Sequence, residues 1–522
     1  MKSKSISRRK FIGNCAACAG AAGIMGSPSW LRSAIPGISP KSSRGVAGDK
    51  LKIRILYALH APVQDRPDWP NKGFDFRPVM DMINGELKVK FPGYTFIPTL
   101  ATGPEQAGKI LDEDKGSPID GYIVYQMNCW NEVAQTMAKS GKPLLYADLQ
   151  YAGSGGFLVY TSEFLSAGAR NVGFVASSRF EDMIAAVRCF EQAKAGGPGF
   201  DFASATARVR TARTPKPGDL ASYPDALRTL DPEETFRRMK ASKIIAVRSD
   251  KPVPAATQMG IPVLYVPFAE LNDDWAAADR DQAQTIADRW TKTAARIEGV
   301  SHEELVNSAA MYLGEKAVIE KHGAAGITIN CLGGFYGGHI HAYPCLGFHE
   351  LNNEGLVGAC ECDVPSASAM VAFSVMTNGR PGYISDPVID TSERRIIYAH
   401  CVATNKVFGP KGAANPFEIL THSEDRQGAS VRSILPAGYM TTSVEVSNDR
   451  KEILLHQAKA VGNDPDDRAC RTKLVAEPVG DIEKLFTMWG KWGWHRVTFY
   501  GDLKKDVYGL ADAMGWKVVE EA

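Results

Sequence analysis

The sequence predicts an α/β protein with two doubly wound domains followed by a β-rich C-terminal domain. Three observations support this prediction. Short apolar runs alternate with helical stretches over residues 51–165, and a second alternation of the same kind covers residues 166–385. From residue 386 to 522 the apolar segments become shorter and more β-like. Alternating strands and helices are typical of a mostly parallel sheet covered by helices on both faces.

The first domain is expected to open with a strand and to close at the glycine-rich stretch 153–156. Its expected strands are 52–57, 94–98, 119–125 and 143–146, with a helix over 77–90. The second domain is expected to contain strands at 172–176, 243–247, 262–266 and 327–330. Its expected helices are 179–195, 234–241, a long one at 274–297, and 367–376. Ser301 and Glu304 form a capping box that predicts one further helix start. In the C-terminal domain, strands are expected at 395–398, 441–446 and 497–500.

The N-terminal segment predicts export. Ser7-Arg8-Arg9-Lys10-Phe11-Ile12 precedes an uncharged run rich in Ala, Gly and Cys, which is too short and too weakly apolar to span a membrane. We interpret residues 1–34 as a twin-arginine signal and 35–50 as a linker. The expected location is therefore periplasmic or extracellular.

Charge and cysteine content narrow the function classes. The 522-residue chain has a formal charge of +1, which falls to about −5 without the first 34 residues, so neither nucleic acid nor an anionic membrane is expected as a partner. No later run resembles a membrane span. The eight cysteines beyond residue 18 lack the spacing of a disulfide scaffold, so mostly buried thiols are expected. The sequence leaves the oligomeric state open, a homo-oligomer included.

Polar residues gather between positions 330 and 425, and seven of the ten histidines fall within 339–495. Carboxylates and imidazoles drawn from distant positions suit a divalent metal such as Mn²⁺ or Zn²⁺. No spacing here is a specific metal motif, so the residues alone leave a metal site and purely structural roles equally open. His302, His322 and His456 are expected on helix surfaces and are assigned no role.

Several segments carry a family resemblance: Pro344-Cys345-Leu346-Gly347-Phe348-His349-Glu350, Ala359-Cys360-Glu361-Cys362-Asp363-Val364, Ala399-His400-Cys401 and Gly493-Trp494-His495-Arg496. Together they resemble the C-terminal half of the L-fucose/L-arabinose isomerase-like superfamily. The resemblance implies two Rossmann-like domains and a β-rich C-terminal domain. It also implies a divalent metal, typically Mn²⁺, held by two acidic residues and a C-terminal histidine.

On this resemblance, Asp363 stands where one acidic ligand is expected and His495 where the histidine is expected. The other acidic ligand is expected roughly two dozen residues before Asp363, where the chain has His339 and His341 and no carboxylate. Either one of these histidines, with His339 as our choice, replaces the carboxylate, or the protein does something else. Alternate residues of an extended strand face opposite sides, so only one of the two can point at a metal.

Each candidate also has a structural interpretation. Asp363 can cap a helix near residue 366, and Glu361 can be a satisfied interior carboxylate. His400 can be a core histidine, and His422 with Arg426 can be surface charge. Trp130, near the carboxyl end of a predicted strand, can stack on a sugar or fill the core.

Two functions follow as hypotheses. The first is an exported metal-dependent enzyme of the sugar isomerase type, with Glu361 and Asp363 as acid/base groups. Asp363, His495 and His339 would bind the metal, and His400, His422, Arg426 and Trp130 would contact the carbohydrate. Export favours an oxidised or modified sugar, through related enediolate chemistry, over a free catabolic aldose. The second hypothesis is a periplasmic carbohydrate-binding protein that keeps the fold and lacks catalysis, which the missing upstream carboxylate favours.

Overall fold

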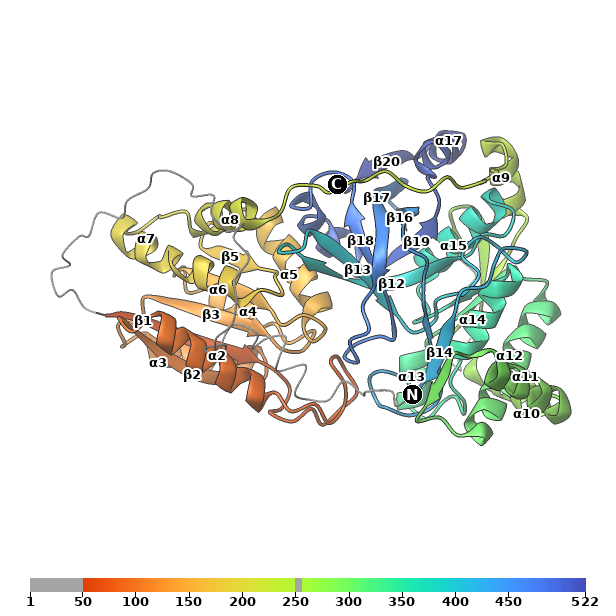
Figure 1. The fold of residues 1–522 in the computed structure, drawn as a ribbon, viewed down its shortest axis with the longest axis horizontal. Coiled ribbons are helices and arrows are strands. Elements are labelled where there is room, and N and C mark those ends of the chain that lie inside the picture. The colour runs from red at the N-terminus through yellow and green to blue at the C-terminus, as the bar shows by residue number, and fades with distance from the viewer. Residues whose placement is uncertain (1–49, 249–255) are drawn as a thin grey trace, which may run out of the picture.

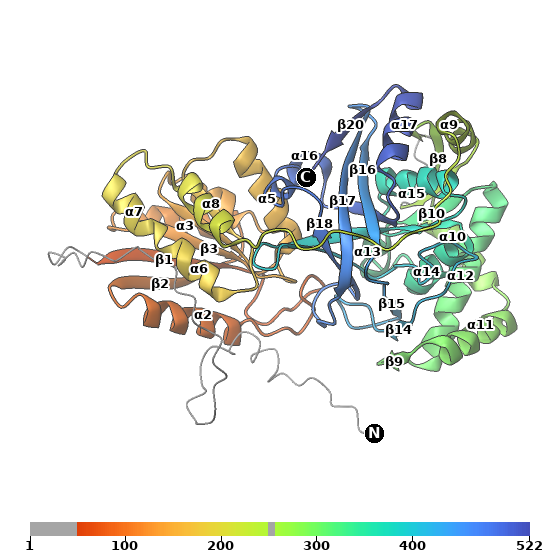
Figure 2. The ribbon, with the colours of Figure 1, turned by 45° about the horizontal axis from the view of Figure 1, so that its top comes forward.

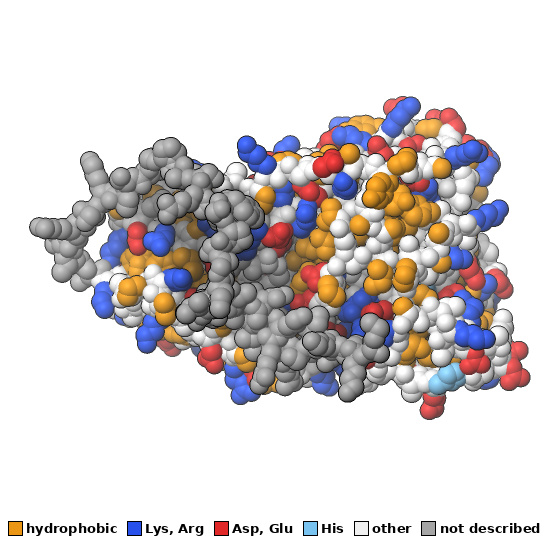
Figure 3. All heavy atoms as spheres, viewed as in Figure 1, with side chains coloured by type: hydrophobic (Ala, Val, Ile, Leu, Met, Phe, Trp, Pro, Cys, Tyr) orange, Lys and Arg blue, Asp and Glu red, His pale blue; other side chains and the backbone are white. Residues whose placement is uncertain are grey.

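The computed structural model describes residues 50–248 and 256–522. The twin-arginine segment and nearly all of the expected linker lie outside the described residues. Figure 1 shows an elongated molecule in which the first sheet and its helices form one lobe. The second sheet and the C-terminal strands form the other lobe, and Figure 2 shows the long C-terminal strands β16 and β17 side by side. Figure 3 shows hydrophobic side chains among charged ones on the surface of this second lobe.

The first sheet is fully parallel and has the order β2-β1-β3-β4-β5, so the strand order reverses between β1 and β3. Its strands are β1 (Leu51–Ala58), β2 (Tyr94–Ala101), β3 (Gly121–Gln126), β4 (Leu144–Asp148) and β5 (Val172–Val175). The helices are α2 (Arg77–Lys90), α3 (Pro104–Asp114), α4 (Val133–Ala138), α5 (Ser154–Ser166), α6 (Phe180–Val187), α7 (Cys189–Gly196) and α8 (Phe202–Arg213). Because β3, β4 and β5 are buried along their whole length, both faces of the sheet need helical cover. The α/β alternation expected for this region is confirmed.

The first unit extends beyond the expected boundary at residue 165. β5, which we expected to open the second domain, pairs with β4 as the fifth strand of the first sheet. α8 packs on β5, and the Ala203 N–H donates to the Arg170 carbonyl. The glycine-rich stretch 153–156 is the start of α5 and does not end the unit. The unit therefore runs to Arg213.

The second sheet has the order β11-β10-β6-β8-β7 and is parallel except for the β7–β8 pair. Its strands are β6 (Ile244–Val247), β7 (Ala256–Gln258), β8 (Ile261–Val266), β10 (Gly326–Ile329) and β11 (Val357–Ala359). The helices are α9 (Pro232–Lys240), α10 (Phe268–Ala277), α11 (Arg280–Thr293), α12 (His302–His322), α13 (Cys331–Tyr336), α14 (Cys345–Glu354) and α15 (Val364–Met376). The capping-box prediction is confirmed in part, because the Ser301 side chain accepts from the Glu304 N–H at the start of α12.

The single long helix expected over 274–297 is wrong. α10 ends at Ala277, and Asp279 starts a new helix by accepting hydrogen bonds from the backbone N–H groups of Asp281 and Gln282. α11 ends at Thr293, and Arg296–Glu298 is a short strand, β9. The side-chain cap breaks the helix because it satisfies N–H groups that a continuous helix would bond to carbonyls one turn earlier.

The C-terminal strands form an antiparallel sheet in the order β16-β19-β12-β13-β18-β17, with β20 added in parallel to β17. β16 also pairs with β17, so the sheet closes on itself. The strands are β12 (Gly382–Asp390), β13 (Arg395–His400), β16 (Met440–Ser447), β17 (Glu452–Asn463), β18 (Thr472–Pro478), β19 (Arg496–Tyr500) and β20 (Lys517–Glu520). The chain adds β14 (Phe417–Leu420) and β15 (Ser430–Ser433), which join β9 in a small sheet, and the helices η1 (Lys484–Phe486), α16 (Trp489–Trp492) and α17 (Lys504–Met514). β12 starts before the expected domain boundary at 385, so its first residues belong to this sheet.

The two lobes contact each other at several places, one of which is the loop after β1. The Lys72 N–H donates to the Glu424 carbonyl at 2.6 Å, and the Ala469 N–H donates to the Pro70 carbonyl at 2.9 Å. Seven of the eight described cysteines are buried, in agreement with the expected buried thiols. Among the described residues, no helix combines the length and the apolar character that crossing a membrane requires.

Candidate metal centre

Strand register brings three polar side chains to one level of the closed sheet. β19, β12 and β13 are neighbours, with Ser385 opposite Arg496 and Asp386 opposite Ala399. Asp386 therefore lies one position from His400 on one side and close to His495 on the other. Residues opposite each other on antiparallel strands share a face, so the register places Asp386 on the same face as His495, which directly precedes β19, whereas His400 joins them from the last position of β13.

Glu361 reaches the same place from the second sheet. It follows β11 in a tight turn in which Glu361 has a φ of 61° and Cys362 a φ of 53°. The Cys362 N–H donates to the Ile329 carbonyl, and Asp363 then caps α15 by accepting from the Ser366 N–H at 3.0 Å. Two consecutive non-glycine residues in the left-handed region are costly, and such strain is often found at functional sites.

Glu361, Asp386, His400 and His495 each place one ligand atom within 4.8 Å of the others. His495 Nε2 is 3.3 Å from Asp386 Oδ1 and 3.5 Å from Glu361 Oε2. His400 Nε2 is 3.7 Å from Glu361 Oε1 and 3.8 Å from Asp386 Oδ2. Both Nε2 atoms are buried and have no hydrogen-bond partner among the described residues. Two nitrogens and two carboxylates that converge without pairing fit a borderline divalent cation such as Mn²⁺ or Zn²⁺.

The two imidazoles differ in their proton arrangement. His495 Nδ1 lies 2.8 Å from Asp363 Oδ2, so the carboxylate accepts the Nδ1 proton and leaves Nε2 as the ring atom that can bind a metal after giving up its own proton. His400 Nδ1 instead accepts the backbone N–H of Cys401 at 3.1 Å, because a backbone N–H can only donate. The neutral His400 ring then carries its proton on Nε2. His495 can therefore bind a metal through Nε2, whereas His400 can donate a hydrogen bond from Nε2.

Electrostatics at the cluster favour a cation. Burial raises the pKa of Glu361, and the neighbouring Asp386 and Asp363 raise it further against the opposing effect of His495 and His400. Burial lowers the pKa of His495, but Glu361, Asp363 and Asp386 outweigh it and raise that pKa well above 6.5. The described residues thus place an excess of negative charge in a largely buried site.

The acidic residue that the sequence analysis lacked is Asp386. It follows Glu361 by 25 positions and lies in β12. Asp363 is not among the four converging residues, because its carboxylate binds His495 Nδ1 and Ser366. The helix-capping interpretation of Asp363 is therefore confirmed, and it has the additional contact with His495.

His339 and His341 lie outside the cluster. Both side chains are exposed in the loop that follows α13, where no strand forms. The His339 ring stacks on Phe268 with ring centroids 5.5 Å apart, and the His341 ring lies 5.7 Å from Trp275. The alternation of faces that we expected for an extended strand does not apply to this loop.

His422 and Arg426 belong to a neighbouring loop and form internal pairs. His422 is buried with Nδ1 3.2 Å from Asp425 Oδ1. Burial lowers its pKa, but the hydrogen bond to Asp425 and nearby acidic groups raise it to about 9. Arg426 donates to Asn71 Oδ1 at 2.7 Å and pairs with Asp467, so it joins the two lobes.

Two exposed tryptophans stand beside the cluster. The Trp130 side chain, four residues beyond β3, is 47% exposed, and Trp494 is 42% exposed. Their ring centroids are 5.1 Å apart, and the Trp494 ring is 5.4 Å from the His495 ring. Trp130 has a φ of 60°, so it lies in a left-handed turn from which its side chain projects to the surface. Sequence reasoning named Trp130 and missed Trp494, although Trp494 directly precedes the predicted ligand His495.

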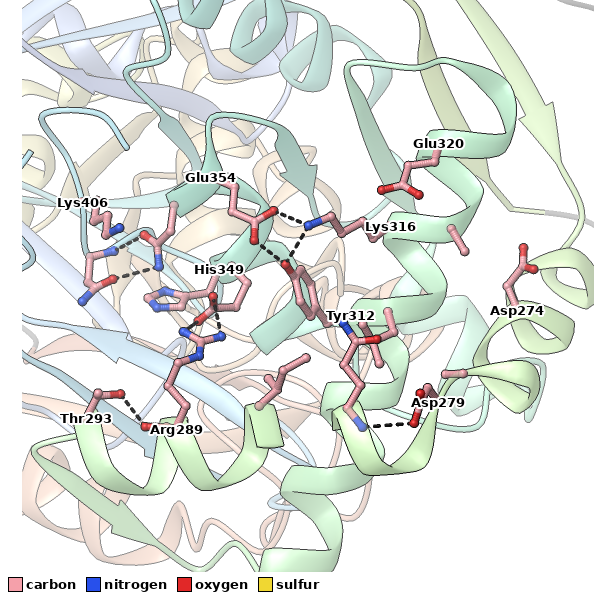
Figure 4. A pocket seen from close by; sticks show the side chains of 18 of the residues that line it. Asp274, Asp279, Arg289, Thr293, Tyr312, Lys316, Glu320, His349, Glu354 and Lys406 are labelled. Atoms are coloured by element: carbon pink, nitrogen blue, oxygen red, sulfur yellow. Dashed lines mark hydrogen bonds and ion pairs between the residues drawn. The ribbon is translucent and has the colours of Figure 1, made fainter. Parts of the chain in front are cut away.

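A separate cavity of about 950 Å³ lies among α11, α12 and α14, and no residue of the cluster lines it. Figure 4 shows two paired groups in it, one around Glu354 and the other around Arg289. Glu354 accepts from the Tyr312 hydroxyl at 2.5 Å and from Lys316 at 3.0 Å. Glu350 accepts from Arg289 at 3.0 Å and from the Trp290 indole at 2.7 Å.

Comparison with known proteins gives no family. No family model matches the chain, and no curated protein matches it. Partial similarity is found to a LacI-family regulatory protein from Chloroflexus aggregans, at 10% identity and a TM-score of 0.16 over 53% of this chain and 76% of that one. A periplasmic solute-binding protein from Actinobacillus succinogenes with bound D-allose is similar at 11% identity and a TM-score of 0.16, over 62% and 89% of the two chains. A LacI-type transcription regulator from Bifidobacterium animalis subsp. lactis follows at 9% identity and a TM-score of 0.14, over 64% and 84%. TM-scores this low carry no inference about fold or function.

Proposed function

We propose that this chain is a divalent-metal-dependent enzyme of the sugar isomerase type. The observation that carries the proposal is the cluster of Glu361, Asp386, His400 and His495, whose ligand atoms converge in a buried place without satisfying one another. Buried polar groups are normally paired, and an unpaired set of this composition is best explained by a cation.

We assign Glu361, Asp386 and His495 as the residues that hold the metal. The Asp363 carboxylate supports this assignment, because it fixes the His495 ring with Nε2 directed at the two carboxylates. His400 is assigned to the substrate, because its Nε2–H can donate to a sugar oxygen. When bound, the metal polarises a substrate carbonyl and its neighbouring hydroxyl.

In aldose–ketose isomerisation a base removes a proton from one carbon and returns it to the adjacent carbon, through an enediol. Glu361 is our candidate for this transfer, because burial raises its pKa and so strengthens the carboxylate as a base. Asp386 is the second candidate, since it faces the same centre. The chemistry resembles that of the L-fucose/L-arabinose isomerase-like superfamily, with Asp386 in place of the upstream carboxylate that we first expected.

A carbohydrate substrate is supported by Trp130 and Trp494. Exposed aromatic rings offer apolar faces to the C–H groups of a sugar, and these two rings come from different lobes and meet next to His495. The alternative of a non-catalytic carbohydrate-binding protein rested on the missing second carboxylate. Asp386 removes that reason.

Proton transfer can be tested without knowing the natural sugar. The purified chain with Mn²⁺ is incubated in D₂O with L-fucose, L-arabinose, D-arabinose and the corresponding ketoses, and deuterium incorporation at C1 or C2 is followed by NMR. We expect incorporation with at least one sugar, its loss in Asp386→Asn, and its retention in Glu354→Gln at the separate cavity. Metal binding and sugar-induced thermal stabilisation without any exchange would reject the isomerase and favour the binding protein.

Export through the twin-arginine route is proposed from Ser7–Ile12 alone. Replacing Arg8-Arg9 by Lys-Lys is expected to leave the precursor in the cytoplasm, as measured by cell fractionation. Normal export of this variant would exclude the proposed signal.

A further inference from the structure

A second buried network lies directly behind the proposed metal ligands, and Glu521 is at its centre. Glu521, Arg496 and Tyr398 have no exposed surface, and His456 is 3% exposed. Arg496 donates from Nε and Nη2 to the Glu521 carboxylate at 3.0 and 2.6 Å. His456 donates from Nδ1 to Glu521 Oε2 at 2.9 Å. The sequence analysis placed His456 on a helix surface, but it lies in β17 with both ring nitrogens bonded.

One branch of this network holds the turn that carries His495. With Nε and Nη2 bound to Glu521, the Arg496 guanidinium directs Nη1 to the carbonyls of Gly493 and His495, at 3.1 and 2.6 Å. The guanidinium also lies 3.8 Å from the centroid of the Trp489 ring. The backbone on both sides of Trp494 is thereby tied to one rigid group, which fixes the point from which the His495 ring projects.

The other branch reaches the strand that carries His400. His456 Nε2 accepts the Tyr398 hydroxyl proton at 2.5 Å, and Tyr398 stands two residues before His400 on β13. Residues two apart on a strand share a face. Anchoring Tyr398 therefore also fixes the part of β13 from which the His400 side chain projects. One carboxylate therefore supports two of the four converging side chains, on two different strands.

We propose that Glu521 is a positioning residue for the metal centre, acting on His495 through Arg496 and on His400 through His456 and Tyr398. This inference rests on the proposed function, since it presumes a metal at the cluster. Glu521 contacts neither metal nor substrate. Its part is to keep the ligand geometry fixed while the site is empty, so that binding costs less reorganisation.

The neighbouring residue provides a matched control. Glu520 is also a glutamate near the C-terminal end, but its side chain is 41% exposed and pairs with Lys504 at 2.8 Å and with the Tyr508 hydroxyl at 2.7 Å. Glu521→Gln and Glu520→Gln change the same chemical group one position apart. Only the first removes a charge from the network behind the ligands.

The test is calorimetric titration of the full chain with Mn²⁺ alone, together with thermal unfolding of the metal-free proteins. Loss of outer contacts at metal sites typically weakens affinity about 10–100-fold. We expect such a loss in Glu521→Gln and wild-type affinity in Glu520→Gln. A purely structural role would lower the unfolding temperature of Glu521→Gln and leave the Mn²⁺ affinity of its folded form unchanged, which would overturn the proposal.

A second variant covers the case in which Glu521→Gln does not fold. Arg496→Lys keeps the positive charge opposite Glu521, but a lysine cannot hold Glu521 and two carbonyls at once. We expect its Mn²⁺ affinity to fall as well, and wild-type affinity would overturn the proposal. A wild-type chain that binds no divalent ion would refute the proposed function and the positioning role together. Wild-type binding with unaffected variants would refute the positioning role alone.

Discussion

The metal cluster and the separate cavity use similar residues in opposite ways. In the cavity, Glu350 and Glu354 each accept hydrogen bonds from a basic side chain and from an aromatic donor. In the cluster, Glu361 and Asp386 face two imidazole nitrogens at 3.3–3.8 Å, and neither nitrogen is hydrogen-bonded among the described residues. Both regions are polar, and the cavity also has two buried atoms without a partner, His349 Nε2 and Asp274 Oδ2. Among the described residues, however, only the cluster brings such nitrogens together with two carboxylates at one point.

This difference separates a structural polar region from a site. Pairing within the protein satisfies the polar groups and leaves them little unused binding capacity. An unpaired buried group costs about 1–3 kcal/mol, which a folded chain retains where a ligand recovers it. The size of a cavity is therefore a poorer guide here than the state of its hydrogen bonds.

The largest expected effect is a loss of Mn²⁺ affinity in variants of the cluster but not in a variant of the cavity. Asp386→Asn and His495→Ala each remove a direct ligand, so we expect Mn²⁺ affinity to fall by at least ~10-fold. Glu354→Gln in the cavity should bind Mn²⁺ as the wild type does. Metal content after dialysis and calorimetric titration measure both, with circular dichroism as a check on folding. Full metal retention in the two cluster variants would place the metal elsewhere.

A second prediction concerns the pH dependence of stability that a further buried carboxylate near the cluster, Glu445, should cause. Glu445 is buried and accepts from the Ser366 hydroxyl; burial, with repulsion from Asp363, raises its pKa to about 8. The folded protein then holds a proton between about pH 4.5 and 8 that the unfolded chain releases, so stability falls as pH rises through this window. Glu445→Gln removes this dependence.

The free energy of unfolding of the variant, relative to that of the wild type, should therefore be higher at pH 8 than at pH 5 by on the order of a few kcal/mol. Urea unfolding at the two pH values gives the difference, in which pH-independent costs of the substitution cancel. A difference that stays constant between pH 5 and pH 8 would mean that Glu445 is already ionised in the folded protein.

For Glu350 in the cavity, we expect stability to depend on pH in the opposite direction. Burial raises the pKa of Glu350, but His349, Arg289 and the Trp290 indole lower it overall. Its stabilising effect is thus present above about pH 4.5 and is lost as pH falls below that value. We expect Glu350→Gln to cost about 1 kcal/mol at pH 7 and less in acid. A cost that grows on acidification would contradict the pairing described for this cavity.

The smallest expected effect is spectroscopic. Trp494 lies next to His495, whereas Trp275 lies on α10 near the cavity. A paramagnetic ion such as Mn²⁺ at the cluster should quench part of the tryptophan emission. Trp494→Phe should remove most of this quenching, and Trp275→Phe should preserve it. Equal quenching in both variants would argue against a metal beside Trp494.

Local patterns in the sequence predicted the scaffold well. The strands of the first sheet, the helix over 77–90 and the start of α12 depend on apolar periodicity and capping, which nearby residues determine. The prediction failed for the helix over 274–297, where the Asp279 cap interrupted a continuous helical pattern. β5 was predicted as a strand, but its assignment to the second domain differs from the structure, because its pairing with β4 is decided by a partner about 30 residues away.

The candidate site was found in part. Glu361, His400 and His495 were named from the sequence, and Asp386 was missed, since nothing in the residues around it distinguishes it from a strand carboxylate. Asp363 was proposed as a ligand but lies outside the cluster, because the left-handed turn at Glu361 and Cys362 directs the two carboxylates differently. His339 was proposed because no carboxylate stood in the expected segment, and its side chain also lies outside the cluster.

The sequence by itself determined many of the helices and strands, the near-neutral charge and three of the four residues of the candidate metal site. Only the tertiary structure decided which of these residues meet. Asp386 and His495 meet because of the register between β12 and β19, His400 joins them from the end of β13, and Glu361 reaches them across the boundary between two sheets. Register and sheet-to-sheet packing arise from contacts between residues far apart in the chain, and such contacts leave no local periodicity to read.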